Sequence, residues 1–291
     1  MATLSFGNIT INLSDHTVIM GILNVTPDSF SDGGQYYDVD TAVDHAKKMI
    51  ADGADLIDIG GESTRPGAKT VSVEEELKRV IPVIKQLTKE TTIPLSIDTS
   101  KAIVAEQAIQ AGATMVNDVT ALRADPNLAE IINKYDINIS LMHMKGSPQS
   151  MQKNPAYDDI IEEIKDFLKQ RIDSAVDHGI PQNHIIIDPG IGFGKRTGKG
   201  IEDNCRIISH LHEFKELDCP ILIGVSRKRF IGNICNDQLP LPASKRLEGS
   251  LAAACAAALQ GAAIVRVHDV KETRRCLDII DCIKKDGNIL S

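Results

Sequence analysis

The chain has 291 residues, of which 42% are hydrophobic and 25% charged, proportions typical of a globular protein with a sizeable core. Its formal net charge of −8 argues against nucleic-acid binding, which usually shows as a basic excess, but a local cluster of cations could still bind a small anion. The N-terminus lacks a basic region followed by an apolar stretch, and no apolar run could span a bilayer, so we expect a cytoplasmic protein without membrane partners.

The first predicted element is a hairpin, and a regular alternation follows it. Residues 4–17 alternate and contain Gly7-Asn8, which predicts a small β-hairpin that could close the bottom of a barrel. Eight apolar runs come next, at 18–30, 56–67, 94–101, 115–120, 137–146, 184–195, 220–230 and 264–269. Helical periodicity follows each run, at 39–53, 73–90, 100–111, 127–135, 157–178, 201–216, 244–261 and 270–285.

Eight strand–helix repeats predict a (β/α)₈ TIM barrel that forms a single domain over residues 1–291, with the hairpin at its N-terminus. A doubly wound open sheet is the alternative, and it is disfavoured because no G-x-G-x-x-G pattern follows the first strand. The six cysteines all lie in the last third and form no CxxC pair, which favours free thiols and disfavours a structural zinc site.

Each apolar run carries polar side chains at its C-terminal end. Residues i and i+2 of a strand share a face, so Ser96 points with Asp98, and Arg266 points with His268. The same spacing relates Ile186 to Asp188, Met115 to Asn117, and Ser140 to Met142. For any one of these residues, a functional role is no better an explanation than a buried polar group that forms its hydrogen bonds with the backbone. Five strands together predict an active site on the barrel rim.

The polar groups divide by chemistry. Three acceptors converge from strands three, four and six, and they suit a flat heterocycle with several N–H donors on one edge: Asp98, Asn117 and Asp188. Lys228 would donate to a carbonyl or ring nitrogen, and Met142 and Phe193 could sandwich the ring. Arg266 and His268, facing Asn24, predict an anion site. The alternative is a salt bridge of Arg266 to an interior carboxylate.

Two strand-to-helix connections are long and rich in Gly, Pro, Ser and Asp: residues 26–38 and 63–72. Short loops are the norm in such folds, so long ones on the rim are interpreted as lids. They carry Asp28, Phe30, Arg65 and Pro66, which composition alone would describe as solvated loop residues.

Taken in order, eight segments closely resemble the dihydropteroate synthase family. They are MGILNVTPDSFSDGG (20–34), DIGGESTRPGA (58–68), SIDTSKA (96–102), NDV (117–119), MHMKG (142–146), IDPGIGFGK (187–195), GVSRKRFIG (224–232) and RVHDV (266–270). The resemblance implies a (β/α)₈ enzyme of folate biosynthesis. Such an enzyme condenses 6-hydroxymethyl-7,8-dihydropterin pyrophosphate with 4-aminobenzoate to give 7,8-dihydropteroate and pyrophosphate.

The resemblance also implies a role for each matching residue. The pterin would be held by Asp98, Asn117, Asp188 and Lys228, with Met142 and Phe193 lining its pocket. The pyrophosphate would be held by Asn24, Arg266 and His268, with Thr64 near the β-phosphate and Asn24 also ligating Mg²⁺. The aminobenzoate site would be shaped by Phe30, Pro66 and Ser226, with Asp28 and Arg65 closing over it. The catalytic residues would be Asp28, Arg65, Asp98 and Lys228. Some family members have a small hydroxyl residue where this chain has Arg229, which bears on carboxylate recognition.

The implied chemistry is a dissociative substitution. Mg²⁺, Arg266 and His268 would neutralise the leaving pyrophosphate, and the lids would exclude water from the pterin cation. The pterin substrate would therefore bind first. The resemblance also implies sulfonamide inhibition and a homodimer. A pterin-dependent methyltransferase and an inactive pterin-binding homologue are the alternatives. The first would not need Arg266 with His268 or the STRPG loop, and the second should have lost loop residues or the pair of Arg266 and His268. A purely structural barrel would not explain the convergent rim.

Overall fold

Eight parallel strands form one sheet in the order β11-β12-β3-β4-β5-β6-β7-β8. The computed structural model describes residues 3–26, 39–63, 70–146, 151, 155–198, 201–235 and 239–286. The strands are β3 (Val18–Asn24), β4 (Leu56–Gly60), β5 (Leu95–Asp98), β6 (Met115–Asp118), β7 (Asn138–Met142), β8 (Ile185–Asp188), β11 (Leu222–Ile223) and β12 (Ile264–Val267). A parallel bridge between Ile187 and Ile221 joins the two ends of the sheet, so the barrel is nearly closed. The predicted (β/α)₈ fold is confirmed.

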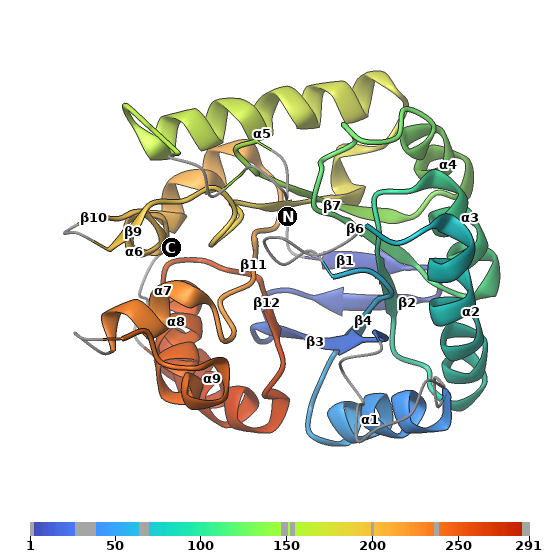
Figure 1. The fold of residues 1–291 in the computed structure, drawn as a ribbon, viewed down its shortest axis with the longest axis horizontal. Coiled ribbons are helices and arrows are strands. Elements are labelled where there is room, and N and C mark those ends of the chain that lie inside the picture. The colour runs from blue at the N-terminus through green and yellow to red at the C-terminus, as the bar shows by residue number, and fades with distance from the viewer. Residues whose placement is uncertain are drawn as a thin grey trace.

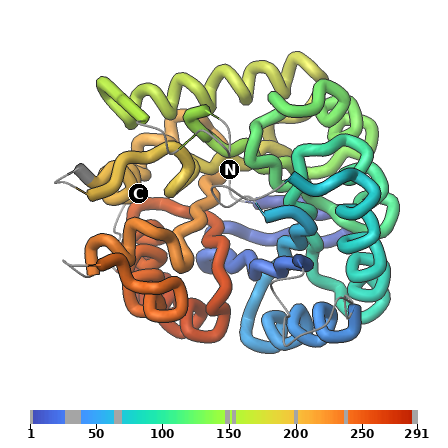
Figure 2. The backbone as a smooth tube through the Cα atoms, in the orientation of Figure 1, coloured from blue at the N-terminus to red at the C-terminus, as the bar shows by residue number. Residues whose placement is uncertain are grey.

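Helices surround the strands, as Figure 1 shows. They are α1 (Val39–Ala51), α2 (Val73–Glu90), α3 (Ala102–Ala111), α4 (Leu128–Tyr135), α5 (Ile160–Asp177), α8 (Leu247–Leu259) and α9 (Val270–Asp286). The predicted bounds of α2 are confirmed. Ser72 caps its N-terminus, because its side chain accepts a hydrogen bond from the amide of Glu75. In Figure 2 the chain runs once around the barrel, so its last strand lies beside its first barrel strand. No helix among the described residues has the length and apolarity needed to cross a membrane.

Two predicted elements are divided in the structure. The segment 201–216 is not one helix but α6 (Asp203–Ser209) followed by a 3-10 helix (Leu211–Leu217). A short hairpin of β9 (Thr197–Gly198) and β10 (Ile201–Glu202) precedes it. The run 220–230 holds only the short strand β11 and the start of α7 (Arg229–Ile234), because Arg227 has a φ of 57° and turns the chain between them. Two further 3-10 turns lie at Gln182–His184 and Ala243–Lys245.

The barrel interior is closed from below by the N-terminal hairpin, β1 (Thr3–Phe6) with β2 (Ile9–Asn12). Leu4 and Phe6 are each 1% exposed, and they pack with a ring of inward-facing residues: Val18, Met20, Leu56, Met115, Ile186, Leu222 and Ile264. The side-chain amide of Asn138 in β7 donates to the carbonyl of Ser5 at 2.6 Å, which ties the hairpin to the barrel. The predicted position of the hairpin is confirmed.

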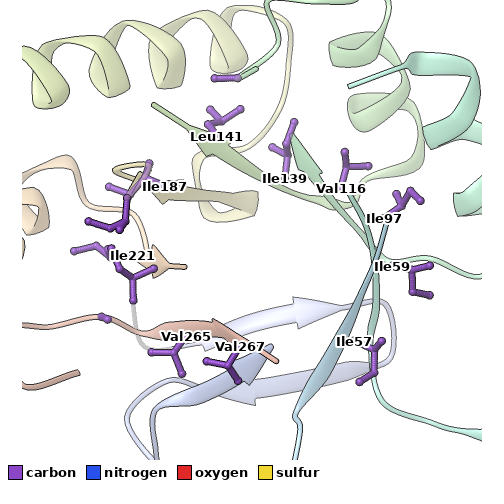
Figure 3. Close-up of a cluster of buried hydrophobic side chains, with 14 of the residues drawn as sticks. Ile57, Ile59, Ile97, Val116, Ile139, Leu141, Ile187, Ile221, Val265 and Val267 are labelled. Atoms are coloured by element: carbon purple, nitrogen blue, oxygen red, sulfur yellow. The ribbon is translucent and has the colours of Figure 1, made fainter. Parts of the chain in front are cut away.

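The opposite faces of the strands are equally apolar. Side chains such as Ile57, Ile97 and Leu141 point outward into the layer between strands and helices, as Figure 3 shows. Both faces of a parallel sheet are covered in this architecture, so its strands are rich in Ile, Val and Leu. Inward polar residues are therefore not explained by exposure to solvent, and they require partners or a function.

Candidate active site

The polar layer begins two residues beyond the inner apolar ring, at the C-terminal ends of the strands. Leu56 is followed by Asp58 on the same face of β4, and Ile264 by Arg266 on the same face of β12. Met115 is followed in the same way by Asn117, and Ile186 by Asp188. The strand register thus lifts these side chains into one layer at the mouth of the barrel, where the active sites of such folds lie.

Arg266 contacts two carboxylates of this layer. Its Nε donates to Asp58 Oδ2 at 2.6 Å, and its Nη2 donates to Asp98 Oδ2 at 2.8 Å. The amide nitrogen of Asn117 donates to the same oxygen of Asp58 at 3.0 Å. The salt bridge of Arg266 to interior carboxylates is therefore present in this structure. Because the Asn117 amide donates to Asp58, its Oδ1 acceptor is turned the other way.

The charges of this cluster do not balance. Burial raises the pKa of Asp98 to about 7; Arg266 opposes this rise, and the nearby charge of Asp58 adds to it. Burial alone would lower the pKa of Arg266, but Asp58 and Asp98 outweigh it, and the net shift is upward. One guanidinium shared by two carboxylates stabilises one negative charge well, so the second carboxylate, Asp98, tends to keep its proton.

Asp188 and Lys228 form a second charged group at the mouth. Burial raises the pKa of Asp188, opposed by a 2.7 Å hydrogen bond from the Gly190 amide and by the charge of Lys228. Burial also lowers the pKa of Lys228 to about 8, opposed by Asp188. The ammonium of Lys228 lies 4.3 Å from the centre of the Phe193 ring, a cation–π contact.

Phe193 also borders a small apolar cluster at the mouth. Met142 and Met144 are each 3% exposed and form this cluster with Met151, and Val119 and Phe193 pack against it. The predicted neighbours Met142 and Phe193 are thus together in the structure. Thioether and aromatic groups provide a polarisable wall for a flat ring, next to acceptors that could bind its edge.

Ser226 holds His268 in a defined orientation. The Ser226 hydroxyl accepts from the backbone amide of His268 at 3.2 Å and lies 3.0 Å from its Nδ1. A hydroxyl that accepts one bond can donate the other, so it favours the tautomer in which His268 carries its proton on Nε2. Ser226 was predicted to shape a second-substrate pocket, and its visible contact is to His268.

Asn24 ends β3 beside Asp98, with only Gly60 between them in the sheet. A Cβ added to Gly60 would lie 3.5 Å from Cβ of Asp98 and 3.9 Å from Oδ1 of Asn24. Among the described residues, no group of three His, Cys, Asp or Glu side chains could hold a metal ion. Mg²⁺ often takes one or two protein oxygens and completes its shell with substrate phosphates and water. The oxygen of Asn24 fits that kind of site.

Five predicted site residues lie outside the described residues: Asp28, Phe30, Thr64, Arg65 and Pro66. Conversely, sequence reasoning assigned no role to Asp58, which is 0% exposed and bonds both Arg266 and Asn117. The signal was available, because Asp58 stands two residues after Leu56 in a strand that is otherwise apolar. Three buried oxygens of this layer have no partner among the described residues: Asp58 Oδ1, Ser96 Oγ and Ser140 Oγ.

Comparisons with known proteins agree on one family. Residues 20–268 match the family of pterin binding enzymes. The dihydropteroate synthase of Bacillus subtilis is 44% identical over 279 residues, which cover 96% of this chain and 93% of that protein. The Yersinia pestis dihydropteroate synthase in complex with a sulfonamide drug superposes with a TM-score of 0.90 at 44% identity, covering 97% of this chain and 99% of that one. The Xanthomonas albilineans enzyme in complex with 7,8-dihydropteroate gives 0.85 at 42% identity, covering 97% and 98%.

Proposed function

The chain belongs to the dihydropteroate synthase family of transferases, and we propose that it joins 6-hydroxymethyl-7,8-dihydropterin pyrophosphate to 4-aminobenzoate, releasing pyrophosphate. The observation that carries the proposal is the convergence of Asp98, Asn117 and Asp188 at one barrel mouth beside Arg266. The pterin ring presents several N–H donors on one edge, and these acceptors match them. A relative of the same fold is complexed with 7,8-dihydropteroate, the product of this reaction.

In this proposal the pterin lies flat against the methionine cluster and Phe193. Asp98, Asn117 and Asp188 accept from its donor edge, and Lys228 donates to its carbonyl or a ring nitrogen. The proximity of Lys228 to both Asp188 and the Phe193 ring supports this placement, because one bound ring would contact all three.

Arg266 and His268 take the pyrophosphate in the proposed complex. They neutralise the negative charge that develops as the carbon–oxygen bond breaks, and pyrophosphate leaves. The pterin methylene then carries a positive charge, which the carboxylate of Asp98 stabilises until the weakly nucleophilic arylamine attacks. The attack forms the carbon–nitrogen bond, and the nitrogen then loses a proton to give the secondary amine of the product. Asn24 would hold Mg²⁺, which supplies additional charge neutralisation on the phosphates when it is bound. The segments 26–38 and 63–72 would exclude water and complete the aminobenzoate site, so the pterin substrate binds first.

The decisive test of this function is pyrophosphate release. The protein is incubated with the pterin pyrophosphate, 4-aminobenzoate and Mg²⁺, while released pyrophosphate and 7,8-dihydropteroate are measured. Release should require 4-aminobenzoate and should fall as a sulfonamide that competes with it is added, as the sulfonamide complex of a relative suggests. Release that is independent of 4-aminobenzoate would contradict the synthase proposal.

The anion site is tested by comparing two ligands. Arg266→Met should raise the Kd of the pterin pyrophosphate about 100-fold through loss of two charge-assisted hydrogen bonds, and that of 6-hydroxymethylpterin by about 10-fold or less. The comparison is needed because the substitution also removes the contacts to Asp58 and Asp98. An equal loss for both ligands would mean that Arg266 serves the pterin cluster and not the pyrophosphate.

We also propose a homodimer formed through the last helices. Ile279 and Ile283 are 62% and 44% exposed one turn apart on α9, so they form an apolar strip on its surface. Ile279→Lys should then shift the protein from dimer to monomer in analytical ultracentrifugation. A wild-type protein that sediments as a monomer at high concentration would end this proposal.

A further inference from the structure

A lysine is buried beside the pterin end of the site. Among the described residues its ammonium forms no ion pair, and the carboxylates of Asp188 and Asp203 act on its charge only from a longer distance. Lys195 is 2% exposed. Its Nζ lies 2.9 Å from the carbonyl of Gly190, 3.0 Å from that of Phe193 and 2.9 Å from Nδ1 of His143. All three partners are neutral, although burying an ammonium is costly and usually requires an opposite charge. A group retained at that cost invites a functional explanation.

His143 is suited to accept from this lysine. Burial, followed by the charges of Lys195 and Arg123, lowers the pKa of His143 to about 2, so its ring is neutral. The ring packs edge-on against Phe167, with centroids 4.9 Å apart. An ammonium has three N–H donors, and two carbonyls with Nδ1 satisfy all of them. A neutral amine would donate to the carbonyls and accept from the other His143 tautomer, so the three contacts hold in either protonation state.

The two carbonyls belong to one tight turn. The amide of Phe193 donates to the carbonyl of Gly190 at 3.0 Å, and Lys195 bonds the carbonyls at both ends of this turn. Gly190 has a φ of 74°, and a Cβ there would lie 1.9 Å from the carbonyl oxygen of His143. The turn is therefore pressed against the segment after β7, and Lys195 connects the two.

This turn determines where two binding groups stand. The carboxylate of Asp188 accepts a hydrogen bond from the amide of Gly190 at the start of the turn. Phe193, at the end of the turn, carries the ring that faces Lys228. A Cβ on Gly192 would lie 3.4 Å from Cδ of Lys228, so the backbone of the turn also contacts that side chain. A displaced turn would move the ring of Phe193 and the ammonium of Lys228 together.

We infer that Lys195 is a positioning residue for the pterin: it fixes the 190–193 turn against His143 and so holds Phe193 and Lys228 in the arrangement that binds the ring. The inference rests on the proposed function, because it assumes that the ligand at this wall is a pterin. Lys195 itself need not touch the ligand. The inference therefore predicts a loss of pterin affinity that exceeds any effect on the second substrate.

The main test replaces Lys195 by methionine, which has a similar shape but no donors. Binding of 6-hydroxymethylpterin is followed by the fluorescence of the pterin, which is measured without tryptophan background because the chain has no Trp. Lys195→Met should raise the Kd and the KM of the pterin pyrophosphate about 10- to 100-fold, whereas the Michaelis constant for the arylamine substrate changes less than about 3-fold. A lower melting temperature with unchanged pterin affinity would make Lys195 merely structural and overturn the inference.

Lys145→Met is the matched control. Lys145 contacts Gly194 of the same loop through its backbone, but its ammonium binds Glu163 at 2.9 Å and lies over the Tyr157 ring, and it makes no hydrogen bond to the 190–193 turn among the described residues. Its loss should lower stability and leave the Kd of 6-hydroxymethylpterin within about 3-fold of wild type. If Lys145→Met weakened pterin binding as much as Lys195→Met, general loosening of the loop would explain both.

A second pair of variants decides the question if Lys195→Met does not fold. His143→Asn keeps an acceptor near the position of Nδ1, whereas His143→Leu removes it. The inference expects His143→Leu to weaken pterin binding and His143→Asn to restore most of it. Equal affinities in the two variants would refute it. Wild-type protein that binds no 6-hydroxymethylpterin would instead refute the proposed function, and the inference would fall with it.

Discussion

Replacing Asp98 by asparagine should remove a pH dependence from the stability of the barrel. Asp98 is 8% exposed and accepts from Arg266 at 2.8 Å. An asparagine can still accept that hydrogen bond through Oδ1, but it does not titrate. The substitution therefore removes the ionisation of this group and keeps most of its geometry.

The sign and size of the effect follow from the shift in pKa. Burial raises the pKa of Asp98 from its ordinary value of 3.8 to about 7, so the folded state holds this proton more tightly than the unfolded chain does. Its contribution to stability is then fully present below about pH 3.8 and is lost as the pH rises through about 7. Linkage between these two values gives a loss of about 2 kcal/mol from about pH 5.5 to about pH 8.5.

The assay is urea unfolding of wild type and Asp98→Asn at a series of pH values. The free energy of unfolding of the wild type, minus that of the variant, should fall by about 2 kcal/mol across this range. Asp44→Asn, at an exposed position of α1, controls for the loss of a carboxylate as such. A difference that is constant with pH would mean that Asp98 is ionised throughout and that Arg266 fully compensates two carboxylates.

Three further results are expected. Asp58→Ala should lower the free energy of unfolding by about 3–5 kcal/mol, because it removes a fully buried carboxylate from Arg266. Asp58→Asn should lower it less, and equal losses in the two variants would show that the charge of Asp58 is unimportant. Lys101→Met should cost about 3 kcal/mol by the same measurement, since the Lys101 ammonium lies 2.5 Å from both Glu62 and Glu76, and Glu76 is 1% exposed. An unchanged free energy of unfolding would mean that these ion pairs add nothing to stability. Removal of Mg²⁺ by EDTA should abolish turnover and leave 6-hydroxymethylpterin binding intact, and turnover that survives chelation would remove the metal from the proposal.

The inward polar residues could be predicted because a strand has a strict two-residue period. Asn117 and Asp188 each stand two residues beyond an apolar residue that faces the barrel interior, and chain order alone makes that visible. Which of these inward-facing polar side chains contact one another could not be predicted from the sequence. Arg266 meets Asp58 across 208 positions of sequence, because the strand register and the closure of the barrel bring β12 and β4 to one mouth.

The run 220–230 shows a limit of local pattern. Its apolar and basic residues are compatible with a continued strand, and the turn at Arg227 has no glycine to announce it. Arg227 is held there by contacts that the sequence does not display, an ion pair with Asp269 at 2.5 Å and a hydrogen bond from its amide to the Ser250 hydroxyl at 2.9 Å. Tertiary contacts thus set the end of β11, and they place Ser226 where it meets His268.

The charge of the cluster bears on how a pterin pyrophosphate would bind as one unit. Arg266 is shared between Asp58 and Asp98, so a phosphate that approaches it alone must compete with two carboxylates already in contact. A pterin ring that donates to Asp98 would take over part of the compensation that the guanidinium now provides, and the guanidinium could then turn its remaining donors to the phosphate at lower cost. In the proposed complex the ring would therefore prepare the anion site for its own pyrophosphate. Free pyrophosphate, which brings charge but no donors for the carboxylates, should bind weakly in its place.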